Sequence, residues 1–247
     1  MAFPQRTRSV SFETIIGRLS LPILHYTEYM RNIVIAPGEY YHLYNRGVDK
    51  RNVFTGKIDY DRFITLLYAC NGTRAVDLDE QGKNIATLLE RGTDRGESLL
   101  DICAYVLMPN HFHIMAREIR ERGISQFMQK LGVAYTSYFN KKYDRTGSLF
   151  QGTYKAKHAS KDPYCSYIAS YIHLNPVKLI EPDWKEAGIK NFGAAEKFLS
   201  EYSYSSYLDY CGNKRTEKVI LNKNSLPSYC KSAGDFRKEV KTWLNKA

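Results

Sequence analysis

Apolar and polar positions follow two different spacings along the chain, and each spacing predicts its own elements. Residues 40–45, rich in aromatics, and residues 99–107, almost all apolar, predict two strands. A turn at Met108-Pro-Asn110 leads to a third strand over residues 111–117. Apolar residues at helical spacing predict the remaining elements, which are helices over 59–70 (with Asp59 as cap), 124–143 and 162–175.

The order strand, helix, strand, strand, helix predicts an α+β fold. We expect a ferredoxin-like antiparallel sheet with helices packed on one face. Residues 72–98 are polar and contain four glycines, which predicts an insertion around a short helix near residues 85–89. The organised sequence begins near Met30. We therefore predict an N-terminal appendage over residues 1–29, a main domain over 30–180 and a C-terminal extension over 181–247.

Composition excludes several classes of protein. None of the apolar runs in the 247 residues approaches the roughly 18 that span a bilayer, so we expect no membrane protein. The five cysteines are scattered and form no C-x-x-C pair. That distribution argues against a disulfide framework and against a cysteine-rich zinc site, and it predicts a cytoplasmic protein.

The excess of positive charge predicts a polyanionic partner. Lys and Arg number 36 and Asp and Glu 26, a formal net charge of +10. Residues 117–161 hold ten basic and three acidic residues, a net +7, with tyrosines interleaved. This favours nucleic acid, with an anionic membrane or a plain solvated helix face as the alternatives. The candidates for phosphate contacts are Lys141, Lys142, Arg145, Lys155 and Lys157.

The sequence Pro109-Asn-His111-Phe-His113-Ile-Met115 carries the clearest candidate chemistry. In a strand, His111 and His113 point to the same side while Phe112 and Ile114 face the core. Two neighbouring neutral imidazoles form half of a metal site. The alternative is a pair of surface histidines beside a turn. Imidazole also suits Zn2+ or Ni2+, so the pair does not select one metal.

A second candidate lies on the helix over residues 162–175. Tyr164, Tyr167, Tyr171 and Asn175 are spaced so that they share one helical face, where tyrosines usually pack against a core. The amide of Asn175 on that face needs a polar partner. His173 points elsewhere, which makes it the weaker ligand candidate. Periodicity alone does not choose among the three tyrosines.

Taken together, these motifs resemble a known family. Leu107-Met-Pro-Asn-His-Phe-His-Ile-Met115, Gly147-Ser-Leu-Phe-Gln151 and Tyr171-Ile-His-Leu-Asn-Pro-Val177 occur in this order. They are similar to the REP-associated tyrosine transposases, which belong to the single-tyrosine, HUH-type superfamily of insertion-sequence transposases. The resemblance runs from about residue 40 to 177, and it implies that residues 30–180 form an HUH catalytic domain.

The resemblance implies a role for each matching residue. His111 and His113 would be the HUH pair, Tyr171 the catalytic tyrosine and Asn175 a further metal ligand. Members of the family need Mg2+ or Mn2+, cut single-stranded DNA beside a hairpin through a covalent 5′-phosphotyrosine, and several relatives are homodimers. The resemblance therefore implies a metal-dependent endonuclease and strand transferase. The alternatives are a transposase-derived protein that binds hairpin DNA without cutting it and a zinc hydrolase unrelated to DNA.

Overall fold

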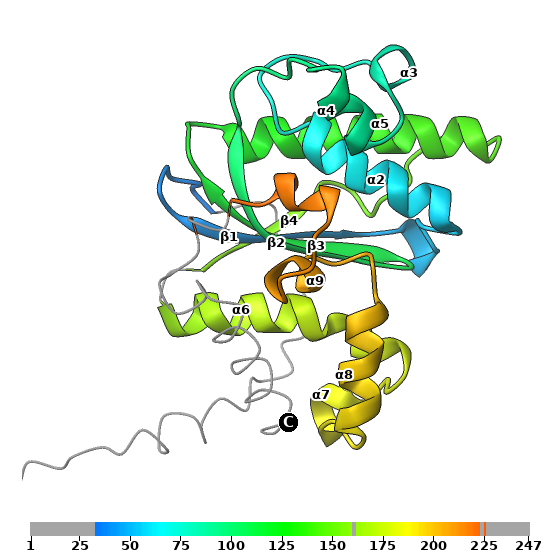
Figure 1. The fold of residues 1–247 in the computed structure, drawn as a ribbon, viewed down its shortest axis with the longest axis vertical. Helices are drawn as coiled ribbons and strands as arrows, with labels where there is room; N and C mark the ends of the chain where they lie inside the picture. The colour runs from blue at the N-terminus through cyan, green and yellow to red at the C-terminus, as the bar shows by residue number, and fades with distance from the viewer. Residues whose placement is uncertain (1–32, 160–161, 223–224, 226–247) are drawn as a thin grey trace, which may run out of the picture. The chain divides into compact units, whose positions relative to one another are not determined.

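Four antiparallel strands form a single sheet in the computed structural model, which describes residues 33–159, 162–222 and 225 (Figure 1). The sheet has the order β2-β3-β1-β4, so β1 pairs with both β3 and β4. All three strand pairings are antiparallel. The strands are β1 (Tyr40–Arg46), β2 (Leu100–Met108), β3 (His111–Glu118) and β4 (Lys155–His158).

Strand β2 is apolar almost throughout because both of its faces are buried. Leu100 and Ile102 face one hydrophobic cluster, and Cys103 and Val106 face another on the opposite side of the sheet. The pairing with β3 shifts register between Ile102 and Ala104. At this bulge, Cys103 is an extra residue in the alternation, so that Cys103 and Ala104 both face the second cluster.

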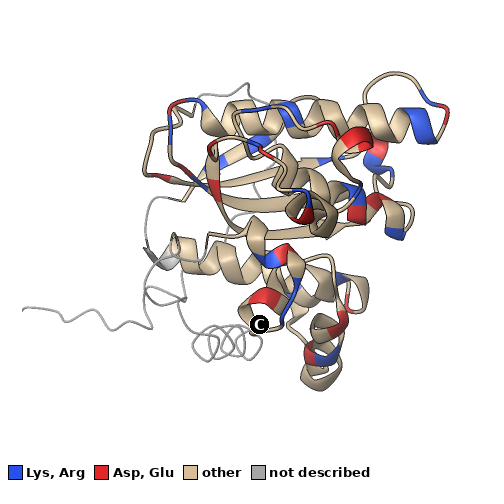
Figure 2. Cartoon of the chain, turned by 45° about the horizontal axis from the view of Figure 1, so that its top comes forward, with Lys and Arg blue, Asp and Glu red and all other residues tan. Residues whose placement is uncertain are grey.

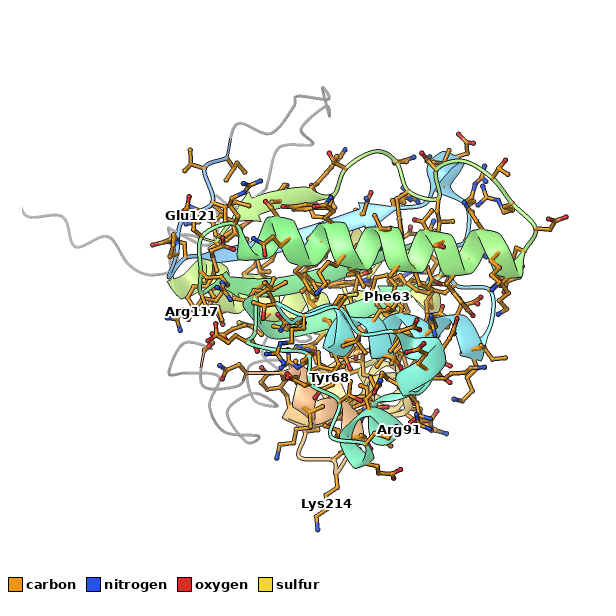
Figure 3. The ribbon with its side chains drawn as sticks, turned by 90° about the horizontal axis from the view of Figure 1, so that it is seen from above. Phe63, Tyr68, Arg91, Arg117, Glu121 and Lys214 are labelled. Atoms are coloured by element: carbon orange, nitrogen blue, oxygen red, sulfur yellow. The ribbon has the colours of Figure 1, made fainter. Side chains whose placement is uncertain are left out.

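Two long helices cover the first face of the sheet. Phe63 joins them, because its ring lies 5.0 Å from that of Phe112 in β3 and 4.8 Å from that of Tyr135 (centroid distances). Figure 3 looks onto this layer, with Phe63 labelled among the packed side chains. The helices on this side are α2 (Lys57–Ala69) and α5 (Gly123–Lys142), with the short α3 (Leu78–Gln81) and α4 (Ile85–Glu90) between them in the chain.

A second helical layer covers the opposite face (Figure 1). Its hydrophobic cluster joins Val106 of β2 and Met115 of β3 to Ile172, Trp184 and Leu199. The layer consists of α6 (Asp162–Leu174), η2 (Asn175–Leu179), α7 (Trp184–Ala187), α8 (Phe192–Glu201) and α9 (Tyr207–Tyr210). The shorter 3-10 turns η1 (Val48–Lys50) and η3 (Thr216–Ile220) lie in connecting segments.

The predicted α+β, ferredoxin-like fold is confirmed. The chain order β1-α2-β2-β3-α5-β4 is that of the ferredoxin-like motif, and its two helices share one face of an antiparallel sheet. The expectation of helices on one face holds for α2 and α5, whereas α6 packs on the other face, against β2 and β3. Strand β4 was not expected, since only four residues pair and two of them are lysines.

Three further expectations were changed or lie beyond the described chain. Gly56, rather than Asp59, is the N-cap of α2, because the helix begins at Lys57 and Asp59 lies within its first turn. The expected appendage over residues 1–29 lies outside the described residues. The expected extension from residue 181 contributes Trp184 and Leu199 to the cluster under the sheet. Within the described chain, each helix is too short or too polar to cross a membrane, and the four described cysteines form no disulfide.

Candidate active site

The two histidines of β3 share the face that α6 covers. Phe112 and Ile114 point into the cluster under α2 and α5, so the alternation along β3 sends His111 and His113 to the opposite side. The two imidazole rings lie 5.0 Å apart between centroids, at 86° to one another. The predicted side-by-side placement of the pair is therefore present in the structure.

Helix α6 brings the predicted nucleophile to this pair. The ring of Tyr171 lies 5.5 Å from that of His113, centroid to centroid. Asn175, just beyond the end of α6, is buried with 3% of its surface exposed, and its side chain lies near enough to His111 to act on the ionisation of that imidazole. Four residues from β3, α6 and η2 thus meet at one place. The polar neighbour of the Asn175 amide at this place is His111.

Periodicity could not choose among the tyrosines of α6, but the fold separates them. Tyr167 and Tyr164 follow Tyr171 along the same helical face. The ring centroids of Tyr164 and Tyr167 lie 6.1 Å apart, and those of Tyr167 and Tyr171 lie 6.2 Å apart. Of the three, Tyr171 is the one with ring contacts to the histidines. His173, on another side of α6, is fully buried and hydrogen-bonds the Ser206 hydroxyl at 2.7 Å.

A third histidine joins the site, and sequence reasoning missed it. His42 of β1 lies with its Nε2 2.8 Å from Nδ1 of His113. Its ring centroid is 6.1 Å from that of Tyr171. The signal in the sequence was the alternation of Tyr40-Tyr-His-Leu-Tyr44, in which Tyr41 and Leu43 enter the core and His42 faces the other way. Only the pairing of β1 with β3 places it beside His113.

Hydrogen bonds orient both histidines of the pair. Nδ1 of His111 lies 2.6 Å from Oδ1 of Asn110, and because an amide oxygen only accepts, that nitrogen carries the proton. Nε2 of His111 then keeps a lone pair. Between Nδ1 of His113 and Nε2 of His42 either nitrogen can be the donor, and in the tautomer in which His113 donates, its Nε2 is left as an acceptor. Metal-binding histidines typically use one ring nitrogen for such a hydrogen bond and the other for the ion.

The three imidazoles are neutral at pH 7. Burial lowers the pKa of His42 to about 3 and that of His111 to about 4, and nearby lysines and Arg46 act in the same direction. Burial also lowers the pKa of His113 well below its usual value, assisted by the two neighbouring histidines. Neutral imidazoles can donate lone pairs to a metal ion, whereas imidazolium cannot.

The donors present fit a divalent ion with oxygen and nitrogen ligands. Among the residues that the structure describes, no three His, Cys, Asp or Glu side chains are grouped to hold a metal. A three-donor protein site here would therefore use His111, His113 and the amide oxygen of Asn175. Such a set leaves positions for water or phosphate oxygens.

Positive charge surrounds the histidines. Arg46, Lys178 and Lys185 each act on the ionisation of His111, and Lys157 acts on that of His42. These residues come from the end of β1, from η2, from α7 and from β4. Sequence reasoning identified Lys157 alone among them. The site is therefore built to attract an anion, such as a phosphodiester, rather than a cationic group.

The predicted phosphate contacts are divided between the two layers. Lys155 and Lys157 pair with Tyr44 and His42 across the β1–β4 ladder, which places them on the face of the histidines. Lys141, Lys142 and Arg145 lie at or just beyond the end of α5, in the layer across the sheet. Figure 2 likewise shows Lys and Arg on both helical layers.

Two of the three residues near the end of α5 have partners within the protein. Nζ of Lys142 lies 2.6 Å from the buried carboxylate of Asp59. Arg145 donates a hydrogen bond to the side chain of Asn140 at 3.0 Å. The ion pair with Asp59 gives Lys142 a structural role that the sequence did not suggest.

Comparison with known proteins gives one family match, over part of the chain. Residues 79–175 match the family model described as IS200-like transposases. A solved structure of a REP-associated tyrosine transposase bound to a REP hairpin is 14% identical, with a TM-score of 0.48 over 78% of this chain and 90% of that chain. The tRNA(His) guanylyltransferase of Saccharomyces cerevisiae is 13% identical, with a TM-score of 0.30 over 82% of each chain. No curated protein matches the chain.

Proposed function

Because residues 79–175 of this chain match the family model of the IS200-like transposases, we propose that the protein cuts and rejoins single-stranded DNA beside a hairpin. Tyr171 is the proposed nucleophile, and the reaction is metal-dependent. The observation that carries the proposal is the meeting of Tyr171 with His111, His113 and Asn175. These residues come from β3 and from α6 with the turn after it, and their meeting supplies a nucleophile and metal donors at one place.

The chemistry of the proposed step is a transesterification at phosphorus. The phenolic oxygen of Tyr171 forms a bond to phosphorus while the bond from phosphorus to O3′ breaks. The phenolic proton passes to solvent, and the departing O3′ takes up a proton. The products are a 5′-phosphotyrosine and a free 3′-hydroxyl, and the covalent bond conserves the strand end for rejoining.

His111, His113 and Asn175 are the residues that would hold Mg2+ or Mn2+. When bound, such an ion polarises the scissile phosphate and neutralises part of its charge. The protein's own contribution begins with its cations, because Arg46, Lys157 and their neighbours draw the phosphodiester to the site. A phenol is almost entirely protonated at pH 7, so the nucleophile needs charge stabilisation nearby.

Formation of a covalent adduct tests this function. Incubated with hairpin-bearing single-stranded DNA and Mg2+ or Mn2+, the full chain should form a protein–DNA adduct that survives denaturing electrophoresis. Tyr171→Phe removes one hydroxyl and should abolish the adduct, because the ring still packs but no oxygen can attack. Tyr164→Phe and Tyr167→Phe are the matched controls and should retain it.

The same assay separates the alternatives. Hairpin binding without any adduct would favour a DNA-binding protein that does not cut. Cleavage that persists undiminished in EDTA and in His111→Ala and His113→Ala would refute the metal assignment. An adduct that peptide mapping places on Tyr164 or Tyr167 would refute the choice of nucleophile.

A further inference from the structure

A lysine from outside the family-matched segment lies against the proposed nucleophile. Lys185 belongs to α7, ten residues beyond the last matched position, 175. Its Nζ donates a hydrogen bond to the hydroxyl of Tyr171 at 2.9 Å and lies 4.1 Å from the centre of the Tyr171 ring. The neighbouring Trp184 is buried in the cluster under the sheet, so the backbone that carries Lys185 is anchored.

The charge of Lys185 is available for the site. Among the described residues, no carboxylate forms an ion pair with its ammonium, and the side chain is otherwise exposed. The same ammonium acts on the ionisation of His42, His111 and His113. It therefore lies where a phosphate bound at the histidines would also feel its charge.

We propose that Lys185 is a catalytic residue, whose ammonium stabilises negative charge on the oxygen of Tyr171. This inference rests on the proposed function. In cleavage, charge on that oxygen grows as its proton leaves and before the bond to phosphorus is complete. In rejoining, the 3′-hydroxyl attacks phosphorus and gives up its proton to solvent, the bond from phosphorus to the Tyr171 oxygen breaks, and the phenolate departs and later takes up a proton. A fixed hydrogen-bond donor at this oxygen favours both directions.

Single-turnover rates of adduct formation provide the test. With hairpin DNA and Mn2+, Lys185→Met should slow both adduct formation and rejoining about tenfold to a hundredfold. Lys185→Arg should recover a large part of the rate, because a guanidinium still donates and carries charge. Lys197→Met removes an exposed lysine of α8 and is the matched control, with the rate expected to stay at the wild-type value.

A modified substrate shows which oxygen Lys185 serves. Sulfur in place of the bridging 3′-oxygen makes a better leaving group, so it should compensate for a lost donor at the leaving atom. If Lys185 acts on Tyr171, cleavage of this substrate should remain slow in Lys185→Met. Recovery to the wild-type rate would overturn the inference, since it would place Lys185 at the departing 3′-oxygen.

Failure of this inference differs from failure of the proposed function. Wild-type adduct formation with an unchanged rate in Lys185→Met would refute the role of Lys185 alone. No adduct in the wild-type protein would refute the function itself. Should Lys185→Met fail to fold by circular dichroism, Lys185→Gln, which retains a polar side chain of similar length, carries the same expected loss.

Discussion

At the scale of single residues, the orientation of His111 and His113 depends on the side chains that hydrogen-bond their rings. Asn110 binds Nδ1 of His111, and His42 binds Nδ1 of His113. Asn110 also donates from Nδ2 to the carbonyl of Lys50, so its amide is fixed at both ends. Each imidazole is thereby held with Nε2 directed to other partners. A ligand set held in advance loses less entropy on binding an ion.

This arrangement predicts the effect of removing His42 on metal affinity. His42→Leu should weaken Mn2+ binding about 10- to 100-fold, because His113 loses the partner that fixes its ring and tautomer. Isothermal titration calorimetry without DNA measures the affinity directly. His42→Gln is the control, because its amide oxygen can accept the same hydrogen bond and should preserve binding. Equal affinity in the wild-type and Leu proteins would contradict the role of His42.

At the scale of elements, the carboxylate of Asp59 joins α2 to α5. It is fully buried and accepts hydrogen bonds from Nζ of Lys142 and from the hydroxyls of Tyr138 and Tyr143 at 2.6 to 2.9 Å. Burial opposes ionisation of Asp59, but the hydrogen bonds from Lys142, Tyr143 and Thr55 outweigh it and hold its pKa below the usual value. Asp59 therefore remains ionised at neutral pH.

Removing Lys142 should therefore destabilise the fold rather than only weaken DNA binding. We expect Lys142→Met to lower the free energy of unfolding by about 2–3 kcal/mol, because a buried carboxylate loses its cation. Urea denaturation measures this value. Lys141→Met removes the adjacent, exposed lysine and should change stability by no more than about 0.5 kcal/mol. The same loss in both variants would show that the ion pair with Asp59 contributes nothing.

At the scale of the whole molecule, the sheet separates two basic regions. Arg46, Lys157, Lys178 and Lys185 surround the histidines beneath α6. The lysines at the end of α5 belong to the layer on the other face of the sheet. Under the proposed function, a strand of DNA cut at Tyr171 lies on the first of these surfaces. The positions of the charges thus predict which lysines contact the substrate at the cleavage site.

Paired charge removals test that division. Lys155→Gln with Lys157→Gln should weaken binding of single-stranded DNA and reduce the slope of log affinity against log salt by about 0.7 per lost contact. Lys141→Gln with Arg145→Gln removes the same charge and should change the slope less, because these residues lie across the sheet from the site. Fluorescence anisotropy over a salt series supplies both slopes. A larger effect from the second pair would show that the DNA binds at the end of α5 instead.

Several features followed from the sequence alone because they depend on local periodicity. The alternation of β3 decided that Phe112 enters the core and that His111 and His113 share the other face. The amphipathic spacing of α5 decided which of its residues pack against the sheet. The order of strands and helices was sufficient for the ferredoxin-like class. In each case, the physical cause acts between residues a few positions apart.

The remaining features depended on contacts between distant residues, which only the tertiary structure decides. His42 meets His113 because β1 pairs with β3 in one register, and Lys142 meets Asp59 because α5 crosses α2. Lys185 reaches Tyr171 because α7 packs beside α6 under the sheet. From charge and residue type, the sequence indicated which histidines and lysines were candidates for a functional site. Burial, register and helix packing decided which of these side chains meet, and with which partners.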